Sequence, residues 1–260
     1  MLILQTARYL VKSYQAAKKG EKLSGLMQVL SPLKDSAFDP LAPSVMPPKP
    51  QTVADAVSLE YLERMLALRV LVLVKQVGER IEEMIKKEKA PFEKAFNAHA
   101  LELEQAATCH ILYFIFHHFK NHVERYQEDA NCKRALGLLC AFWGASELAR
   151  GQQWNGMLDR TSHRLVEEGV NHLLDQLRPD VVALVDAFDI PDSVLNSTLG
   201  RADGNVYEAL YEGAKKSSLN KTVPFYGYEQ VLKPHLDQDF LKLRGRPHPQ
   251  LVEAMKQAKL

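Results

Sequence analysis

Three histidines that lie close together are the first residues in this sequence whose spacing could do chemistry. His118 and His122 are four residues apart, so on a helix they would share a face, and His117 precedes them. A catalytic zinc helix carries His-Glu-x-x-His, but Phe119 stands where the glutamate would be. A di-iron bundle needs Glu-x-x-His pairs, and the two glutamates just upstream lack a histidine three residues later. We therefore predict no metal site and interpret the histidines as helix-face or core residues.

Composition and motifs exclude several other functions. The sequence has no GxGxxG, no GKS/T phosphate loop and no GxSxG. Lys plus Arg total 33 against 32 Asp plus Glu, a balance that argues against nucleic acid or a polybasic membrane surface. No apolar run approaches the roughly 20 residues of a membrane span. Cys109, Cys132 and Cys140 lack CxxC spacing, which is typical of reduced intracellular thiols.

The segments that carry the histidines and cysteines have the sequence patterns of helices. Residues 1–18 have apolar positions near the 3.6-residue period of a helix. Six prolines fall within residues 20–52, which predicts an extended connector because proline lacks the amide donor. Thr52 or Ser58 is a plausible N-cap for the helices beyond. Further helices are expected over Leu59–Lys89, Phe92–Tyr126 (after Pro91), Cys132–Arg150, Arg160–Leu177 and Val181–Phe188.

The apolar run ILYFIF, residues 111–116, has no polar side and predicts a helix at the centre of a bundle. Period-two alternation is almost absent, so we predict no strands. The fold class is therefore all-α, a helical bundle of about five to seven helices.

A segment rich in turn residues follows the predicted bundle. Asp189 and Pro191 are expected to end one helix, and Gly200 to end a short turn. A second turn follows at residues 203–205, where Asp203 or Asn205 can cap the helix VYEALYEGAKK. Two readings remain open for this segment: a pair of capped turns that orient one helix, or a functional surface.

Three stretches of this sequence resemble the peroxisomal acyl-CoA oxidase family. LGRADGNVYEALYEGAKKSSLNK, from residue 199, resembles a C-terminal signature of that family, and QTARYLVKSY, from residue 5, resembles the helix that follows its catalytic glutamate. The chain ends in Ala258, Lys259 and Leu260, a variant of the Ser-Lys-Leu peroxisomal address. The positions that match the family motifs are Gln5, Arg8, Gly200, Arg201, Asp203, Gly204, Asn205, Tyr207 and Glu208.

The resemblance implies an organisation for the chain. Residues 1–19 would be the last helix of the FAD-side helical domain, and residues 20–57 a proline-rich connector. Residues 58–238 would be the C-terminal acyl-CoA oxidase helical domain, and residues 239–260 a tail that carries the targeting tripeptide. The family is homodimeric, and its enzymes use FAD and dioxygen to convert an acyl-CoA to trans-2-enoyl-CoA and hydrogen peroxide.

The resemblance also implies that the chemistry lies elsewhere. The family's catalytic glutamate would precede Met1, so no catalytic residue is carried over, and the residues that would bind the cofactor are not identified. FAD is expected in the full-length enzyme but not on this chain, which we expect to be inactive alone. The alternative is a stand-alone, non-catalytic helical interaction module derived from the oxidase fold. The first helix should have lost its packing partners, which would leave Leu2, Leu4, Leu10 and Val11 near solvent.

The last residues predict a destination. An import receptor reads a free C-terminus, and Pro247 and Pro249 favour a break before Leu251–Lys256 that would present the tripeptide outward. The expected location is the peroxisome, with the import receptor, a fatty acyl-CoA, dioxygen and a second copy of the chain as partners. No nucleic acid and no membrane span are expected.

Overall fold

The structure, a computed structural model, describes residues 2–150, 157–221 and 227–233. Over these ranges it is helical and has no strand, so the predicted all-α class is confirmed. The chain divides into two compact units, Met1–Val185 and Asp186–Leu260. Among the described helices, none is both long and apolar enough to cross a membrane.

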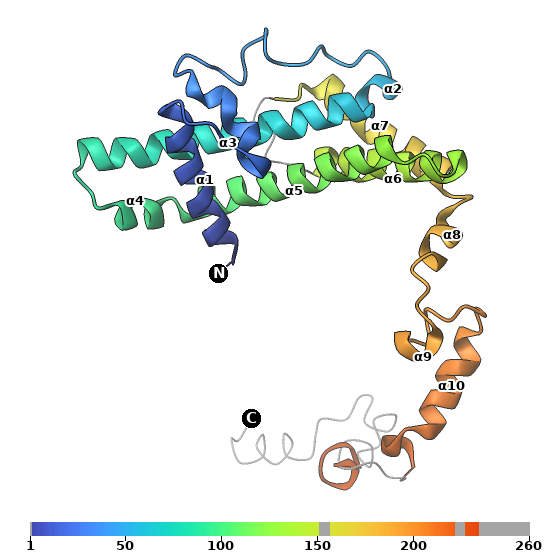
Figure 1. Ribbon diagram of the computed structural model, residues 1–260. Coiled ribbons are helices and arrows are strands. Elements are labelled where there is room, and N and C mark those ends of the chain that lie inside the picture. Colours follow the sequence, from blue (N-terminus) through green and yellow to red (C-terminus); the bar gives the residue numbers. More distant parts are fainter. Residues whose placement is uncertain (1, 151–156, 222–226, 234–260) are drawn as a thin grey trace, which may run out of the picture. The chain divides into compact units, whose positions relative to one another are not determined.

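The first unit is built around two long helices, α3 and α5, that lie side by side (Figure 1). The other extensive contact in this unit joins α6 to α7. The elements of the first unit are α1 (Leu2–Lys18), the 3₁₀ helix η1 (Gly25–Lys34), α2 (Val53–Ala56), α3 (Leu59–Lys87), α4 (Phe92–Ala98), α5 (Ala100–Arg125), α6 (Ala130–Arg150), α7 (Arg160–Leu177) and α8 (Val181–Asp186).

The described part of the second unit holds shorter elements. They are α9 (Asp192–Leu195), α10 (Val206–Lys216), the 3₁₀ turn η2 (Ser218–Asn220) and the π-helical turn η3 (Tyr228–Leu232).

Both proposed N-caps are confirmed. The Thr52 hydroxyl accepts a hydrogen bond from the Asp55 amide, and the Asp55 carboxylate accepts one from the Thr52 amide, which completes a capping box on α2. Ser58 accepts from the Tyr61 amide at 3.3 Å and begins α3. These local bonds explain why the helical region starts where the sequence indicated.

The first helix is better covered than the sequence suggested. Leu10 and Val11 are buried, 1% and 2% exposed, so the prediction that they lie near solvent is wrong. The reason is that η1, α3 and α5 all pack against α1, so the partners of its apolar face come from later in the same chain. Leu4 is 37% exposed, as expected, and the side chain of Leu2 lies outside the described part.

The proline-rich connector is only partly extended. Residues Gly25–Lys34 form a 3₁₀ helix with Pro32 inside it, and Met27, Leu30 and Leu33 are buried in the core. The prediction of a connector without helix is therefore wrong over this range. Burial of three apolar side chains offsets the amide donor that the proline lacks, and it helps to hold a 3₁₀ helix of ten residues, which is long for this type.

The rest of the connector, up to Thr52, consists of turns and extended chain that is tied to α3. The Lys75 ammonium donates to the carbonyl oxygen of Phe38, and the Arg64 guanidinium donates to that of Val45, both at 2.7 Å. These two bonds hold the connector on the surface of the bundle.

The predicted helix over Phe92–Tyr126 is two helices. It breaks at His99, whose φ of −108° and ψ of 24° are not helical and which ends α4 and precedes α5. Within α5, Ile111 and Ile115 are 37% and 43% exposed. The helix is central, as predicted from ILYFIF, because α1, α3 and α6 all pack against α5, but these neighbours leave Ile111 and Ile115 partly exposed.

Two glycines let helices approach closely. A Cβ at Gly144 of α6 would overlap the ring of Phe116 on α5, and one at Gly78 of α3 would overlap the ring of Tyr14 on α1. Phe116 is fully buried, so its ring has little room to move away. Both aromatic rings thus occupy the space that a larger residue at the facing position would need.

We expect Gly144→Ala to lower the free energy of unfolding by about 1–3 kcal/mol, because the methyl group would overpack the Phe116 ring. Gly137→Ala is the matched control on the same helix: its Cβ would meet only Val123, at an ordinary 3.8 Å. That control should be neutral or stabilising, by up to about 1 kcal/mol. Urea unfolding of both variants measures the difference, and equal effects would contradict the close approach.

Stability should fall at acidic pH because of a buried histidine. His110 is 2% exposed, and its Nε2 lies 3.0 Å from the carbonyl oxygen of Leu26, which joins α5 to η1. Burial lowers the pKa of His110 from its usual 6.5, so the unfolded chain takes up this proton more readily than the folded one. This contribution is therefore constant above about pH 6.5 and is lost as the pH falls below it.

Urea unfolding at a series of pH values checks this. His110→Gln keeps a donor for Leu26 but does not titrate, so stability of that variant should depend less on pH between neutral and acidic conditions. Identical slopes in the variant and the natural chain would show that His110 does not carry the effect.

Candidate functional site

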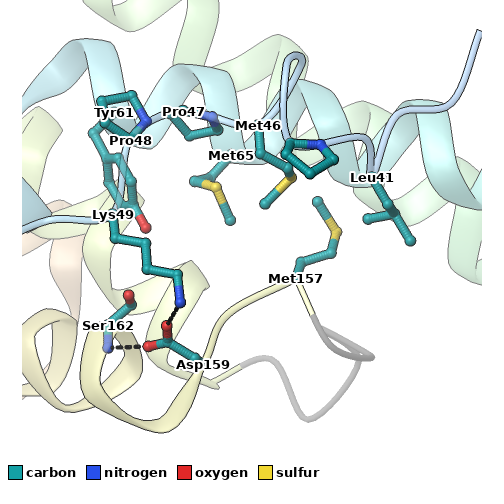
Figure 2. A pocket seen from close by; sticks show the side chains of 11 residues that line it. Leu41, Met46, Pro47, Pro48, Lys49, Tyr61, Met65, Met157, Asp159 and Ser162 are labelled. Carbon is teal, nitrogen blue, oxygen red and sulfur yellow. Dashed lines mark hydrogen bonds and ion pairs between the residues drawn. The ribbon is translucent and has the colours of Figure 1, made fainter.

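A cavity of about 640 Å³ lies between the connector and the bundle (Figure 2). One side is the segment from Leu41 to Lys49, and the other is formed by the start of α3 and the start of α7. Most of its walls are apolar, and three methionines contribute to them. The lining residues are Leu41, Pro43, Met46, Pro47, Pro48, Lys49, Tyr61, Met65, Met157, Asp159 and Ser162.

The polar groups of this cavity lie at one end, and most of them are already paired. The Lys49 ammonium lies 2.6 Å from the Asp159 carboxylate, which also accepts the Ser162 amide at 2.8 Å and so caps α7 (Figure 2). Hydrogen bonds from Lys49 and Ser162 lower the pKa of Asp159 to about 2. Burial, together with the negative charge of Asp159, raises the pKa of Tyr61 to about 12. At neutral pH this end of the cavity therefore presents the Tyr61 hydroxyl as a hydrogen-bond donor, next to the Lys49–Asp159 ion pair, whose charges neutralise each other. These groups can bind a ligand, but none of them readily accepts a proton.

The histidines that the sequence singled out lie along α5, beside a second cavity. His117 and His118 line that cavity, of about 530 Å³, with Tyr113, Phe114 and residues of η1. The His118 ring packs edge-on against Phe114 at 4.2 Å between centroids. His122 bonds through Nδ1 to the carbonyl oxygen of His118 at 2.8 Å. In the described part of the chain, no three His, Cys, Asp or Glu side chains come together in a group that could hold a metal ion.

A half-buried charge network ties His117 to α3. Its Nδ1 lies 2.5 Å from one oxygen of Glu63, and the Lys120 ammonium lies 2.7 Å from the other. Burial alone would raise the pKa of Glu63, but hydrogen bonds from Lys120 and His117 outweigh it, so the pKa is lowered. The Asn121 amide lies 2.9 Å from Nε2 of His117. Since both ring nitrogens have partners, His117 serves to hold α5 against α3.

The cysteines offer no reactive thiolate beside this network. Cys109 and Cys140 are buried and Cys132 is exposed, and all three are free. Burial raises the pKa of Cys140 to about 12, so its thiol stays protonated at neutral pH.

The motif around residue 200 folds into a turn held by its own side chains. The Arg201 guanidinium pairs with the Asp203 carboxylate, with Nε 2.9 Å from Oδ1, and Asp203 also accepts the Asn205 amide at 3.0 Å. Hydrogen bonds from Arg201 and Asn205 lower the pKa of Asp203 to about 2. Gly204 has a φ of 68°, a left-handed conformation that glycine adopts without strain.

This turn leads directly into α10, whose bounds are those of the predicted helix VYEALYEGAKK. Asn205 occupies the N-cap position, but its side chain bonds the Glu208 carboxylate instead of a helix amide. The prediction that Asp203 or Asn205 caps α10 is therefore only half right: the position is correct and the capping bond is not made. Tyr207 is 87% exposed at the start of the helix.

Gln5 and Arg8 of the QTAR sequence lie on the exposed side of α1, whereas Ala7 is buried. Arg8 donates to the Glu93 carboxylate of α4 at 2.8 Å, and its guanidinium lies 5.2 Å from the centre of the Phe96 ring. Gln5 is exposed. The targeting residues Ala258, Lys259 and Leu260 lie outside the described residues.

Sequence reasoning missed the Lys49–Asp159 cavity and the network around Glu63. One local signal was available for the first, since Asp159 directly precedes an amphipathic helix and so has the position of an N-cap. Its pairing with Lys49 has no local signal, because the two residues are brought together only by the path of the connector.

The comparisons with known proteins agree on one family. The acyl-CoA oxidase family model matches residues 58–237. The chain is 34% identical over 236 residues to peroxisomal acyl-coenzyme A oxidase 1 of Rattus norvegicus, an alignment that covers 90% of this chain and 35% of that protein. Acyl-coenzyme A oxidase acox-1.3 of Caenorhabditis elegans is 31% identical over 241 residues, which is 92% of this chain and 34% of that protein.

Solved structures show the same relationship in three dimensions. Acyl-CoA oxidase 1 of Arabidopsis thaliana superposes with a TM-score of 0.76 at 27% identity, covering 91% of this chain and 35% of that one. Acyl-CoA oxidase-2 of Caenorhabditis elegans, bound with FAD, ascaroside-CoA and ATP, gives 0.74 at 28%, covering 95% and 34%. The chain thus spans about a third of the length of these relatives. With the family model matching well over half of its residues, the chain belongs to the acyl-CoA oxidase family.

Proposed function

We propose that this chain forms the C-terminal part of an FAD-dependent acyl-CoA oxidase of peroxisomal fatty acid β-oxidation. The complete enzyme would convert an acyl-CoA and dioxygen to trans-2-enoyl-CoA and hydrogen peroxide. The observation that carries the proposal is the match of residues 58–237 to the acyl-CoA oxidase family, together with the name of the rat relative. A structure of Caenorhabditis elegans acyl-CoA oxidase-1 complexed with FAD and ATP supports the cofactor assignment for the family.

The same proposal assigns roles to the segments. Residues 1–19 would end the helical domain that carries FAD, and residues 20–57 would connect it to the helical domain of residues 58–238. Residues 239–260 would form the tail read by the peroxisomal import receptor. The Gln5 side chain and one face of α1 are exposed, so both can contact the rest of the helical domain that carries FAD. We further propose that the enzyme is a homodimer.

The two cavities described above do not fit FAD by themselves. A pyrophosphate group needs several donors or cations, and the first cavity offers one ammonium, Lys49, which Asp159 already neutralises. The second cavity is lined by aromatic rings, two histidines and residues of η1. We therefore assign no step of the oxidation to residues of either cavity. In this proposal the chain supports the fold and assembly of the enzyme.

The isolated 260-residue chain is expected to produce no peroxide from palmitoyl-CoA and to retain no FAD. The physical reason is that, in the described residues, neither cavity presents an unpaired carboxylate as a general base or a group that would hold a pyrophosphate. A peroxide assay and the flavin absorbance of the purified chain measure both properties, with full-length rat acyl-coenzyme A oxidase 1 as the positive control. Turnover above background would contradict this expectation.

Sequencing the transcript upstream of the Met1 codon separates the proposal from its alternative. An in-frame stretch similar to EGxNT that bears a glutamate would support the oxidase. A mature protein of 260 residues in cells, translated from a transcript without such a stretch, would favour the stand-alone interaction module instead.

A fluorescent protein fused upstream of the intact chain is expected to collect in peroxisomes, because Ala258, Lys259 and Leu260 form the address. Deletion of these three residues should release the fusion to the cytosol, and replacement of the tripeptide by Ser-Lys-Leu should keep it in peroxisomes. Microscopy with a peroxisomal marker measures the distribution. A cytosolic signal from the intact fusion would refute the targeting proposal and leave family membership unchanged.

A further inference from the structure

The first cavity, between the connector and the bundle, has the composition of a binding site for a small apolar molecule. Its volume of about 640 Å³ lies within the usual range for small-molecule sites, roughly 300–1,000 Å³. Met65 and Met157 line it although they are only 1% and 7% exposed, so part of its wall is shielded from bulk water. A cavity with mostly apolar walls favours an apolar occupant, because water there finds few hydrogen-bond partners.

The arrangement of the walls fits a molecule with one long, unbranched chain. The polar groups lie at one end of the cavity, near Lys49, and Leu41 and Met157 lie toward the other end (Figure 2). Met46 and Met65 lie between the two ends (Figure 2). A methionine side chain is unbranched and flexible, so these walls can adjust to the shape of a chain. The ligand that fits is therefore an amphiphile, with its head group near Lys49 and its tail toward Leu41.

The charges at the polar end favour an uncharged head group. The Asp159 carboxylate, whose pKa is lowered to about 2, is ionised at neutral pH and lies 2.6 Å from the Lys49 ammonium. It also accepts the Ser162 amide at 2.8 Å, which holds it in place. An anionic head group would have to compete with Asp159 for Lys49, and a cationic one would have to compete with Lys49 for Asp159. Either head group would leave one charge of the pair without its partner, which is costly.

Tyr61 supplies the hydrogen bond that an uncharged head group needs. Its pKa is raised to about 12, so its hydroxyl stays protonated at neutral pH and can donate. Within the described ranges, no hydrogen bond engages this hydroxyl, whereas Lys49 and Asp159 already pair with each other. The hydroxyl oxygen of a ligand can accept this bond, and its chain would then lie along the apolar walls.

We propose that the first cavity binds a neutral lipid with one unbranched chain, such as a long-chain primary alcohol. The Tyr61 hydroxyl donates to the oxygen of the head group, and the chain lies against Met46, Met65 and Met157. The site takes no part in the oxidation proposed above, and the inference does not rest on that function.

Titration of the full 260-residue chain with 1-decanol tests the site, with the methionine methyl groups labelled with carbon-13 for NMR. The signals of Met46, Met65 and Met157 are expected to shift. Met27, which is buried in η1, and Met84 of α3 are the matched controls, since neither lines this cavity, and their signals should stay in place. Shifts at Met27 and Met84 alone, or no shift at all, would overturn the proposal.

Isothermal titration calorimetry at neutral pH measures the preference for an uncharged head group. The natural chain should bind 1-decanol at least about tenfold more tightly than decanoate. Asp159→Asn removes the negative charge but keeps an N-cap for α7, so Lys49 is freed and decanoate should bind at least about tenfold more tightly than it does to the natural chain. Addition of Lys49→Met to that variant should abolish the gain. Equal affinity of the natural chain for decanol and decanoate would overturn the proposal of a neutral ligand.

Tyr61→Phe keeps the ring and removes the donor, so it should weaken decanol binding by roughly two- to tenfold, the contribution of one hydrogen bond. Tyr9→Phe is the matched control, because Tyr9 is 59% exposed on α1 and does not line the cavity. Circular dichroism checks that every variant keeps its helix content. Unchanged decanol affinity of Tyr61→Phe would show that Tyr61 is not the donor and would contradict the proposed binding mode.

Discussion

Burial of α3 is the interaction on which the first unit depends. Twelve of its residues are buried, from Leu62 in its first turns to Ile81 near its end, so almost every turn has a partner. The long contact with α5 accounts for much of this burial, and η1, α1, α4 and α6 cover the rest. Because the apolar residues face several directions, no single neighbour could satisfy them. The connector thus contributes core residues as well as linking two helices.

The second unit is held together differently. No residue of α9 or α10 is buried, and the turn before α10 depends on hydrogen bonds among Arg201, Asp203 and neighbouring backbone amides. Exposed bonds of this kind define a local shape but contribute little to stability in water. The segment that resembles the family signature therefore shapes an exposed surface, on which the apolar side chains of α10 lie.

Helix positions were predictable to the extent that their signals are local. Arg160–Leu177 and Val206–Lys216 have the predicted bounds because amphipathic periods and turn residues mark both. The break at His99 was missed, since the sequence has no glycine or proline there. The burial of Leu10 and Val11 was missed because it depends on which surfaces meet. Local patterns specify an element, but they do not say what packs against it.

The sequence by itself determined the helical class, the caps at Thr52 and Ser58, and the oxidase resemblance. The signals for all three are patterns within short stretches of neighbouring residues. Only the tertiary structure decided that Glu63 meets His117, 54 residues later, and that Lys49 meets Asp159. Contacts of this kind depend on how the helices are placed against one another. That placement follows from the burial of the whole core, which no local pattern contains.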